Sequence, residues 1–102
     1  MILEVAVLNI KSGLNADFEQ AFAEAQKIIS AQTGYVSHEL QKCIEVDNQY
    51  VLLVKWQTLE DHTEGFRGSA DYETWRQMLH HFYDPFPVVE HYQLLSLQGL
   101  SD

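Results

Sequence analysis

The segment from Trp56 to Tyr92 contains most of the side chains that could do chemistry. It holds eight of the twelve aromatic residues and four of the five histidines. Aromatic side chains can enclose a flat apolar ligand, and imidazole is the side chain whose charge changes most readily near neutral pH. The combination predicts a pocket for proton chemistry on an aromatic substrate. The alternative interpretation is a hydrophobic core that is rich in aromatic residues.

His62 is the histidine whose position most favours a functional role. It shares one face of an expected short helix with Leu59 and Phe66, and that face must turn inward if the helix is to pack. An inward histidine either forms hydrogen bonds to nearby backbone groups or takes part in chemistry, and both interpretations stay open. His91 lies among mixed neighbours on an expected strand and is open to the same two interpretations.

On the last expected helix, a stripe of large side chains and a pair of histidines lie on different sides. A turn of about 100° per residue gathers five large side chains on one side of the helix. His80 and His81 fall roughly 120° to 140° from the centre of that stripe, so we expect them to flank or leave the pocket. The stripe consists of Tyr72, Trp75, Met78, Leu79 and Phe82.

Trp56 and Arg67 are candidate hydrogen-bond donors. The indole N–H of Trp56, at the end of an expected strand, could point into a cavity, or the ring could pack as core. Arg67 follows the short helix, and its guanidinium could hold a substrate anion or pair with a surface carboxylate.

Several other kinds of site are not expected. The sequence has no His-x-His, His-x-x-x-His or CxxC pair, so we expect no bound metal. It also lacks a nucleophile elbow built around a serine and a glycine-rich phosphate loop. The single cysteine, Cys43, cannot form an internal disulfide and lies in a strand-like segment, which favours a structural thiol.

Length and charge limit the class of protein. With 102 residues, 46% hydrophobic and 21% charged, the chain is expected to form one globular domain over residues 1–102. A net charge of −9 argues against nucleic acid and anionic membranes as partners. The first ten residues have no basic region and include Glu4 in an apolar run, which argues against a secretory signal. We expect a cytoplasmic protein without a membrane span.

The elements that must position these side chains follow the order β-α-β-β-α-β. Turn and capping residues such as Gly34, Thr58 and Ser69 separate the periodic segments, and prolines end the last helix. This order predicts the α+β ferredoxin-like fold, with an antiparallel four-stranded sheet whose first and third strands are central. Strands are expected at 2–10, 35–44, 50–57 and 88–97, and helices after an Asn15 cap, at 58–66 and at 70–83.

The two central strands are apolar on both faces, whereas two helices can cover only one face of the sheet. An uncovered apolar face usually marks an interface. We therefore expect a homodimer in which the two sheets pack against each other.

The most specific motifs lie in the second half of the chain. They are Trp56, the run TLEDHTEGFRGS at 58–69, Trp75 and the run HFYDPFPVVEHY at 81–92. On these residues the chain resembles the antibiotic biosynthesis monooxygenase family over nearly its whole length. The resemblance implies a dimeric α+β barrel of two ferredoxin-like subunits, each with a pocket between sheet and helices. Members include oxygenases that oxidise polycyclic phenols or anthrones with O2 and need no metal, flavin or haem.

The resemblance thus implies a cofactor-independent monooxygenase that acts on a small aromatic or quinol-type substrate. The pocket of such an enzyme must supply a base, hydrogen-bond donors for the developing anion, and aromatic walls that exclude water. His62 is the expected base, with His91 second. The expected donors are Trp56 and Arg67, and the expected substrate-binding walls are Phe66, Tyr72, Trp75 and Phe82.

Two other functions remain open. One is a non-catalytic dimeric module that binds a small aromatic molecule or serves as a stress-related accessory protein, and the other is an isomerase of a small carbonyl compound. The family also contains a haem-degrading branch, whose members have an asparagine on the first strand and a tryptophan and a histidine about ten positions apart. Here the residue ten positions after Trp56 is Phe66 and the one after Trp75 is Pro85, so only Asn9 matches and haem degradation is disfavoured.

Overall fold

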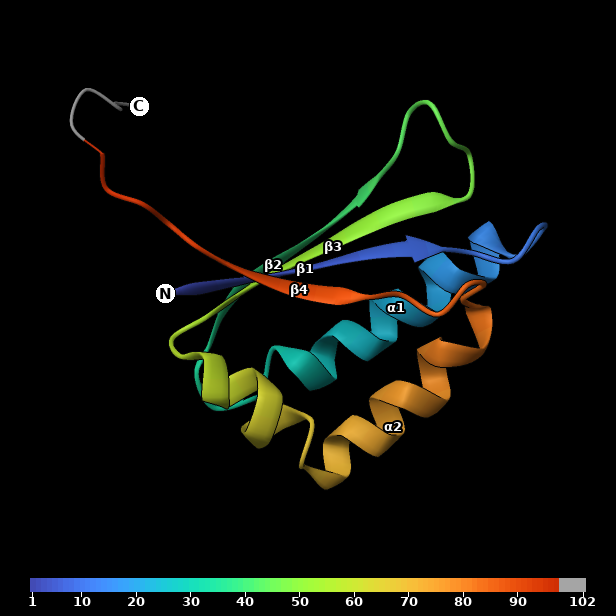
Figure 1. Ribbon diagram of the computed structural model, residues 1–102. Coiled ribbons are helices and arrows are strands. Elements are labelled where there is room, and N and C mark those ends of the chain that lie inside the picture. The colour runs from blue at the N-terminus through green and yellow to red at the C-terminus, as the bar shows by residue number, and fades with distance from the viewer. Residues whose placement is uncertain (98–102) are drawn as a thin grey trace.

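Four strands and two α-helices, with two short helical segments, make up the computed structural model, which describes residues 1–97 (Figure 1). The order β-α-β-β-α-β agrees with the sequence prediction. The last five residues of the domain expected over 1–102 lie outside the described residues. The elements are β1 (Ile2–Asn9), α1 (Asn15–Ile29), β2 (Tyr35–Lys42), β3 (Gln49–Trp56), η1 (Asp61–Phe66), α2 (Ala70–Leu79), η2 (His80–Phe82) and β4 (Val89–Gln93).

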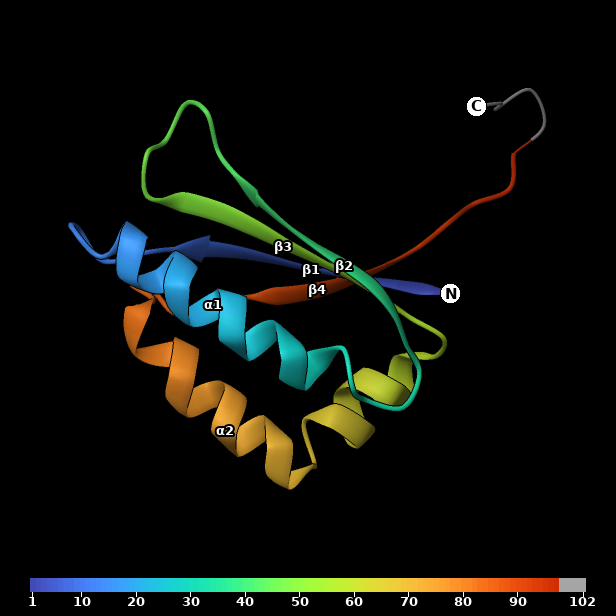
Figure 2. The same cartoon turned by 180° about the vertical axis from the view of Figure 1, so that it is seen from behind.

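The strands form one antiparallel sheet in the order β2-β3-β1-β4. The first and third strands are central, as predicted for a ferredoxin-like fold, and β2 is an edge strand. Both α-helices lie against the same face of the sheet, which the two opposite views show (Figures 1 and 2). The other face is left without a covering layer in a single chain.

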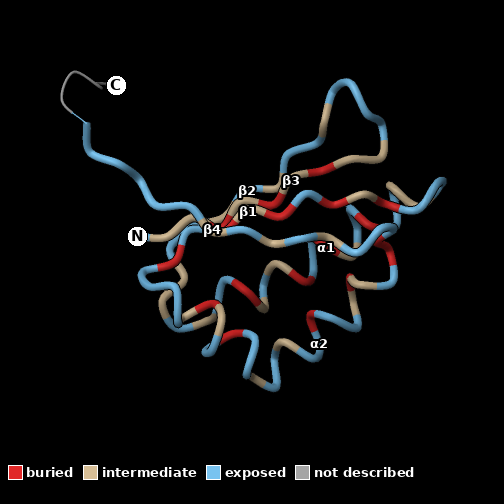
Figure 3. Tube along the Cα trace, in the orientation of Figure 1, coloured by how far each residue is buried: buried red, intermediate tan, exposed pale blue. Residues whose placement is uncertain are grey.

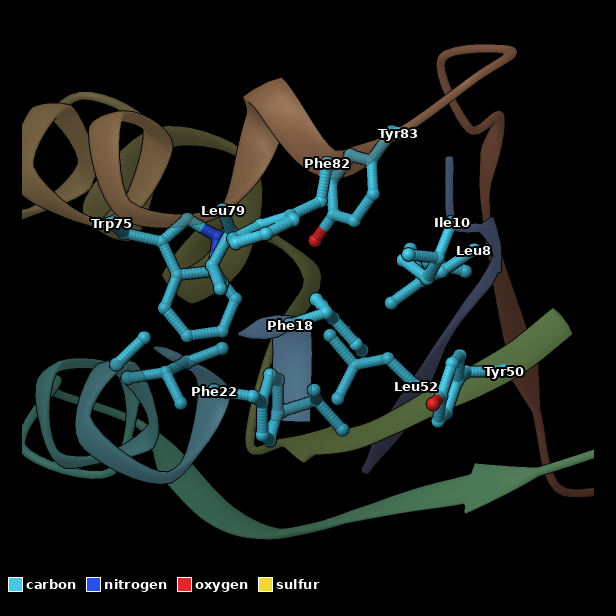
Figure 4. Packing of buried hydrophobic residues seen from close by; sticks show 14 of the residues in the cluster. Leu8, Ile10, Phe18, Phe22, Tyr50, Leu52, Trp75, Leu79, Phe82 and Tyr83 are labelled. Atoms are coloured by element: carbon cyan, nitrogen blue, oxygen red, sulfur yellow. The ribbon is translucent and has the colours of Figure 1, made fainter. Parts of the chain in front are cut away.

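The core fills the space between the inner face of the sheet and the helices. Alternate residues of the central strands point inward and are buried, and α1 contributes one apolar stripe (Figure 3). Phe18 is fully buried, with its ring 5.0 Å from Tyr50 and 5.8 Å from Phe82, so aromatic contacts join α1 to β3 and η2 (Figure 4). Tilted and edge-on ring pairs of this kind add to the stability from apolar burial.

Two predicted caps are confirmed around the helical segment between β3 and α2. The Thr58 N–H donates to Asp61 Oδ2 and the Asp61 N–H donates to Thr58 Oγ1, both at 3.2 Å. The Tyr72 N–H donates to Ser69 Oγ at 3.1 Å and starts α2. The expected α-helix between these caps is instead a π-helix over Asp61–Phe66. Segments with this wider turn occur frequently at functional sites.

Several element ends differ from the sequence prediction. β4 ends at Gln93 rather than at Leu97, and the chain that follows extends away from the sheet (Figure 1). α2 ends at Leu79, and a 3-10 turn covers the remaining predicted helical residues. The predicted Asn15 cap is wrong: Asn15 is the first residue of α1, and its side-chain amide donates to the Asp47 carbonyl at 2.8 Å. No described helix is both long and apolar enough to cross a membrane.

Gly34 makes the turn between α1 and β2 possible. Its φ is +83°, and a Cβ at this position would collide with the side chain of Asp61 in the cap of η1. We expect Gly34→Ala to lower the free energy of unfolding by about 3 kcal/mol, because backbone strain and the collision add.

Gly13→Ala is the matched control, because Gly13 has a φ of +81° and nothing within 4 Å of the added Cβ. It should lose only about 1 kcal/mol from the backbone alone. Urea unfolding of both variants measures the two values, and equal losses would contradict the collision with Asp61.

Candidate active site

A cavity of about 440 Å³ lies between the inner face of the sheet and the segment that runs from η1 to the start of β4. Ala6, Leu8 and Leu52 form its apolar side on the central strands. The opposite wall is rich in rings, and its main members are Phe66, Tyr72, Trp75, His80, Tyr83 and Phe86. The size and the lining suit a small aromatic molecule.

Glu4 is the acidic group on this wall. It is 5% exposed and points inward from the central strand β1, although its immediate neighbours in the sequence are apolar. The indole N–H of Trp56 donates to Glu4 Oε1 at 2.9 Å, and Trp56 itself is fully buried. Such a carboxyl group requires hydrogen-bond donors, because burying a charge without them is very unfavourable.

His62 lies beside this carboxyl group and is 3% exposed. Its Nε2 is 3.4 Å from Glu4 Oε1, and its Nδ1 is 2.8 Å from Nε2 of His91. The His62 ring stacks on Trp56, with 5.3 Å between ring centroids and 18° between planes. The stack on Trp56 and the hydrogen bond to His91 together fix the orientation of the imidazole.

Strand register explains why these groups meet. Glu4 on β1 is the direct partner of His91 on β4, so both side chains point to the inner face of the sheet. The π-helix η1 then places His62 above them, with Phe66 one turn later on the same buried side. We call Glu4, His62 and His91 the acid–histidine cluster.

Burial governs the charges of the acid–histidine cluster. It raises the pKa of Glu4 above its ordinary value, although the Trp56 hydrogen bond and the Arg67 charge act in the opposite direction. Burial, Arg67 and His91 lower the pKa of His62 to about 3, and burial and Arg67 lower the pKa of His91. Both histidines are therefore neutral at neutral pH, and the Glu4 carboxylate takes up a proton before His62 does.

Arg67 is the cationic group on the cavity wall. It follows η1 directly, and within residues 1–97 it forms no salt bridge. An arginine that is free of a carboxylate partner can hold an anionic ligand group or stabilise a developing negative charge.

The structure brings most of the predicted site residues together. His62, Phe66 and Arg67 line the cavity, as do Tyr72 and Trp75. Two others do not line the cavity but contact residues that do: Trp56 donates to Glu4, and His91 forms a hydrogen bond with His62. Phe82 lies in the core against Phe18 and is not on the cavity wall.

The prediction for His80 is wrong, because His80 lines the cavity and its ring lies 4.9 Å from that of Phe86. Leu79 departs from helical geometry directly before His80, with a φ of −121°, although the His80 N–H still donates to the Arg76 carbonyl. The regular turn of about 100° per residue used in the prediction therefore does not hold at this position. His81 is exposed, as expected.

Sequence reasoning missed Glu4 as a site residue. The available signal was an acidic side chain in the middle of an apolar run that predicts a central strand. A charged residue is almost never fully buried in such a place without partners, so Glu4 required a nearby donor. Within residues 1–97, no group of three or more His, Cys, Asp or Glu side chains is arranged to hold a metal ion.

The pKa of His62 predicts a loss of stability in acid. An unfolded histidine titrates near pH 6.5, whereas the pKa of folded His62 is about 3. His62 therefore contributes stability above pH 6.5 that is lost as the pH falls toward 3, and by pH 5 the loss is about 2 kcal/mol. Glu4 has the opposite effect on stability. Because burial raises its pKa, its unfavourable buried charge is neutralised in acid, and this contribution to the free energy of unfolding increases as the pH falls.

Comparison with His62→Phe tests this contribution. Any further rise in the pKa of Glu4 in the variant changes the difference in the same direction, because it stabilises the variant in acid. The advantage of the wild type in free energy of unfolding should shrink between about pH 7 and pH 5. Urea unfolding at each pH measures it, and a constant difference would show that His62 is not buried in its neutral form.

Comparisons with known proteins agree with the fold. The family model described as antibiotic biosynthesis monooxygenase matches residues 1–78. The uncharacterized protein YczJ of Bacillus subtilis strain 168 is 57% identical over 93 residues, which cover 91% of this chain and 98% of that protein.

Two solved structures extend the comparison. A candidate antibiotic biosynthesis monooxygenase from Bordetella bronchiseptica is 33% identical, with a TM-score of 0.88 over 93% of this chain and 97% of that chain. SnoaB from Streptomyces nogalater, a cofactor-independent oxygenase, is 22% identical with a TM-score of 0.75 over 99% and 97% of the two chains. The likeness to SnoaB concerns the fold alone. The resemblance inferred from the sequence motifs is thus confirmed.

Proposed function

The chain belongs to the antibiotic biosynthesis monooxygenase family, and from this premise we propose that it is a cofactor-independent monooxygenase of a small phenol or quinol. The observation that carries the proposal is the buried acid–histidine cluster on the wall of an aromatic cavity. A titratable group with a perturbed pKa in such a place is a candidate for proton transfer.

The reaction starts when the acid–histidine cluster removes the proton of the substrate hydroxyl group. The phenolate then passes one electron to O2, and the resulting radical and superoxide combine to form a carbon–oxygen bond. Breakage of the O–O bond leaves one oxygen atom in a quinone carbonyl and releases the other as water. A phenol and one O2 thus give a quinone and one water, with all four electrons supplied by the substrate.

The rest of the cavity supports this chemistry. Arg67 lies on the wall where it can stabilise the phenolate and the reduced oxygen, since fixed donors act strongly when water is excluded. Phe66, Tyr72 and Trp75 provide rings against which a flat substrate can stack. The protein thus offers a base, stabilisation of the developing charge and aromatic walls, the three contributions that the reaction requires.

Oxygen uptake tests the proposal. Purified protein is mixed with a set of polycyclic phenols and anthrones while the O2 concentration and the quinone absorbance are followed together. The proposal expects protein-dependent O2 consumption matched by product. Thermal stabilisation by the same compounds without turnover would favour a binding module, and product formed equally well without O2 would favour an isomerase.

The proposal includes an assembly of two chains and one domain over residues 1–102. The uncovered sheet face carries the apolar cross-strand pairs Val5–Leu53 and Val7–Val51, which support packing against a second copy. A cytoplasmic location belongs to the same proposal, and the presence of a single cysteine supports it.

A further inference from the structure

We infer that Glu4 is the catalytic base of the proposed reaction, and that Trp56, His62 and His91 are residues that position it. The inference rests on the proposed function and assigns the proton transfer to one atom, Glu4 Oε2. It replaces His62, the residue that the sequence favours as the base.

The polar neighbours of His62 argue against its acting as the base. Its Nδ1 is 2.8 Å from His91 Nε2, and its Nε2 faces Glu4 Oε1 at 3.4 Å. Both ring nitrogens therefore have polar partners within the cluster. His62 could accept a substrate proton only after giving up one of these partners, and the stack on Trp56 holds the ring where it is.

The two oxygens of Glu4 have different surroundings. Oε1 accepts the Trp56 hydrogen bond and faces His62. Oε2 accepts no hydrogen bond from the described residues. Within residues 1–97, Asn15 Oδ1 is the only side-chain polar atom that is both fully buried and without a hydrogen-bond partner. Because Oε2 has no partner either, it is not fully buried, and we place it toward the cavity that Glu4 lines. Oε2 is thus the acceptor available to a bound phenol.

The direction of the hydrogen bonds supports this role. Indole N–H can only donate, so Trp56 fixes Oε1 as an acceptor. If His91 donates to His62 Nδ1, neutral His62 carries its proton on Nε2, which lies 3.4 Å from Oε1. The Trp56 hydrogen bond and the Arg67 charge favour the carboxylate, while burial makes it more basic than an exposed glutamate. A base is most effective when its affinity for protons is raised toward the working pH.

Glu4 returns every proton that it takes. Oε2 first accepts the phenol proton and then delivers it to the peroxide that forms on the substrate carbon. Oε2 next removes the hydrogen from that carbon as the O–O bond breaks, and the leaving hydroxide takes this proton away as water. Glu4 ends the cycle as the carboxylate.

Glu4→Gln tests the inference, because glutamine keeps the shape and an acceptor for Trp56 but cannot take up a proton. With a substrate that the wild type oxidises, we expect kcat to fall by about 100-fold while KM changes by less than about threefold. Glu4→Asp should recover part of kcat. His62→Phe, which keeps a ring on Trp56, should cost only about tenfold and should shift the pH at which kcat is half-maximal.

A second measurement does not depend on turnover. Carbon-13 NMR of labelled glutamate follows the titration of Glu4, identified by the signal that is missing from Glu4→Gln. We expect titration above the ordinary pKa of glutamate and a further rise in His62→Phe. The inference is overturned by an ordinary, unmoved titration, or by active Glu4→Gln protein with nearly full kcat. Absence of O2 uptake by the wild type would instead contradict the proposed function. The NMR titration would then still show whether Glu4 has the raised affinity for protons that the inference requires.

Discussion

Replacing Ala6 with phenylalanine is expected to lower kcat/KM for the phenol substrate by at least about 100-fold. Ala6 is 3% exposed, points inward from the central strand β1 and lines the cavity beside Glu4. A phenyl ring at this position occupies the volume in which the substrate ring must lie. Steady-state O2 uptake measures the effect.

The stability of Ala6→Phe should change little, because the cavity of about 440 Å³ can take the added ring without displacing the core. Ala23→Phe, on the exposed side of α1, is the matched control and should keep full activity. A folded Ala6→Phe protein with unchanged kcat/KM would show that the reaction takes place outside this cavity.

Replacing Val7 with lysine is expected to weaken the proposed dimer by at least about 100-fold in dissociation constant. Val7 lies on the uncovered face of the sheet, opposite Val51 on β3, and is 42% exposed in the single chain. Packing of two sheets would remove it from water, and a buried lysine without a partner is very unfavourable. Light scattering over a series of protein concentrations gives the dissociation constant.

Val46→Lys is the matched control, because Val46 has the same exposed fraction of 42% but lies in the loop between β2 and β3. It should leave the mass of the assembly unchanged. If both variants remain dimeric, the uncovered sheet face is not the interface. A monomeric wild type would contradict the dimer altogether.

Much of the fold could be predicted from local sequence signals. Apolar runs identified the two central strands, and the caps at Thr58 and Ser69 were correctly placed. The end of β4 could not be predicted from the apolar sequence alone. Leu94 and Leu95 continue the apolar pattern, yet they are 88% and 63% exposed in the single chain. An apolar pattern predicts that side chains are buried, but it does not show whether a strand, a helix or a second chain buries them.

The site was predictable to the extent that it depends on one element. His62 and Phe66 share a helix face and are both buried as the spacing indicated, whereas Leu59, expected on the same face, is 40% exposed. Glu4 was missed because its role depends on two residues far away in the sequence. It is the strand partner of His91, and it accepts a hydrogen bond from Trp56 at the end of β3. These neighbours are set by strand register. The position of His80 follows the non-helical φ of Leu79, which the residue pattern did not reveal.

Isotopically labelled O2 provides the most direct test of oxygenation at this cavity. Wild-type protein is incubated with an accepted phenol under labelled O2 in ordinary water, and the quinone is examined by mass spectrometry. We expect one labelled oxygen atom per quinone, with the signal lost in Ala6→Phe. A quinone whose newly added oxygen comes from water, or one that forms at the same rate without O2, would contradict the monooxygenase mechanism.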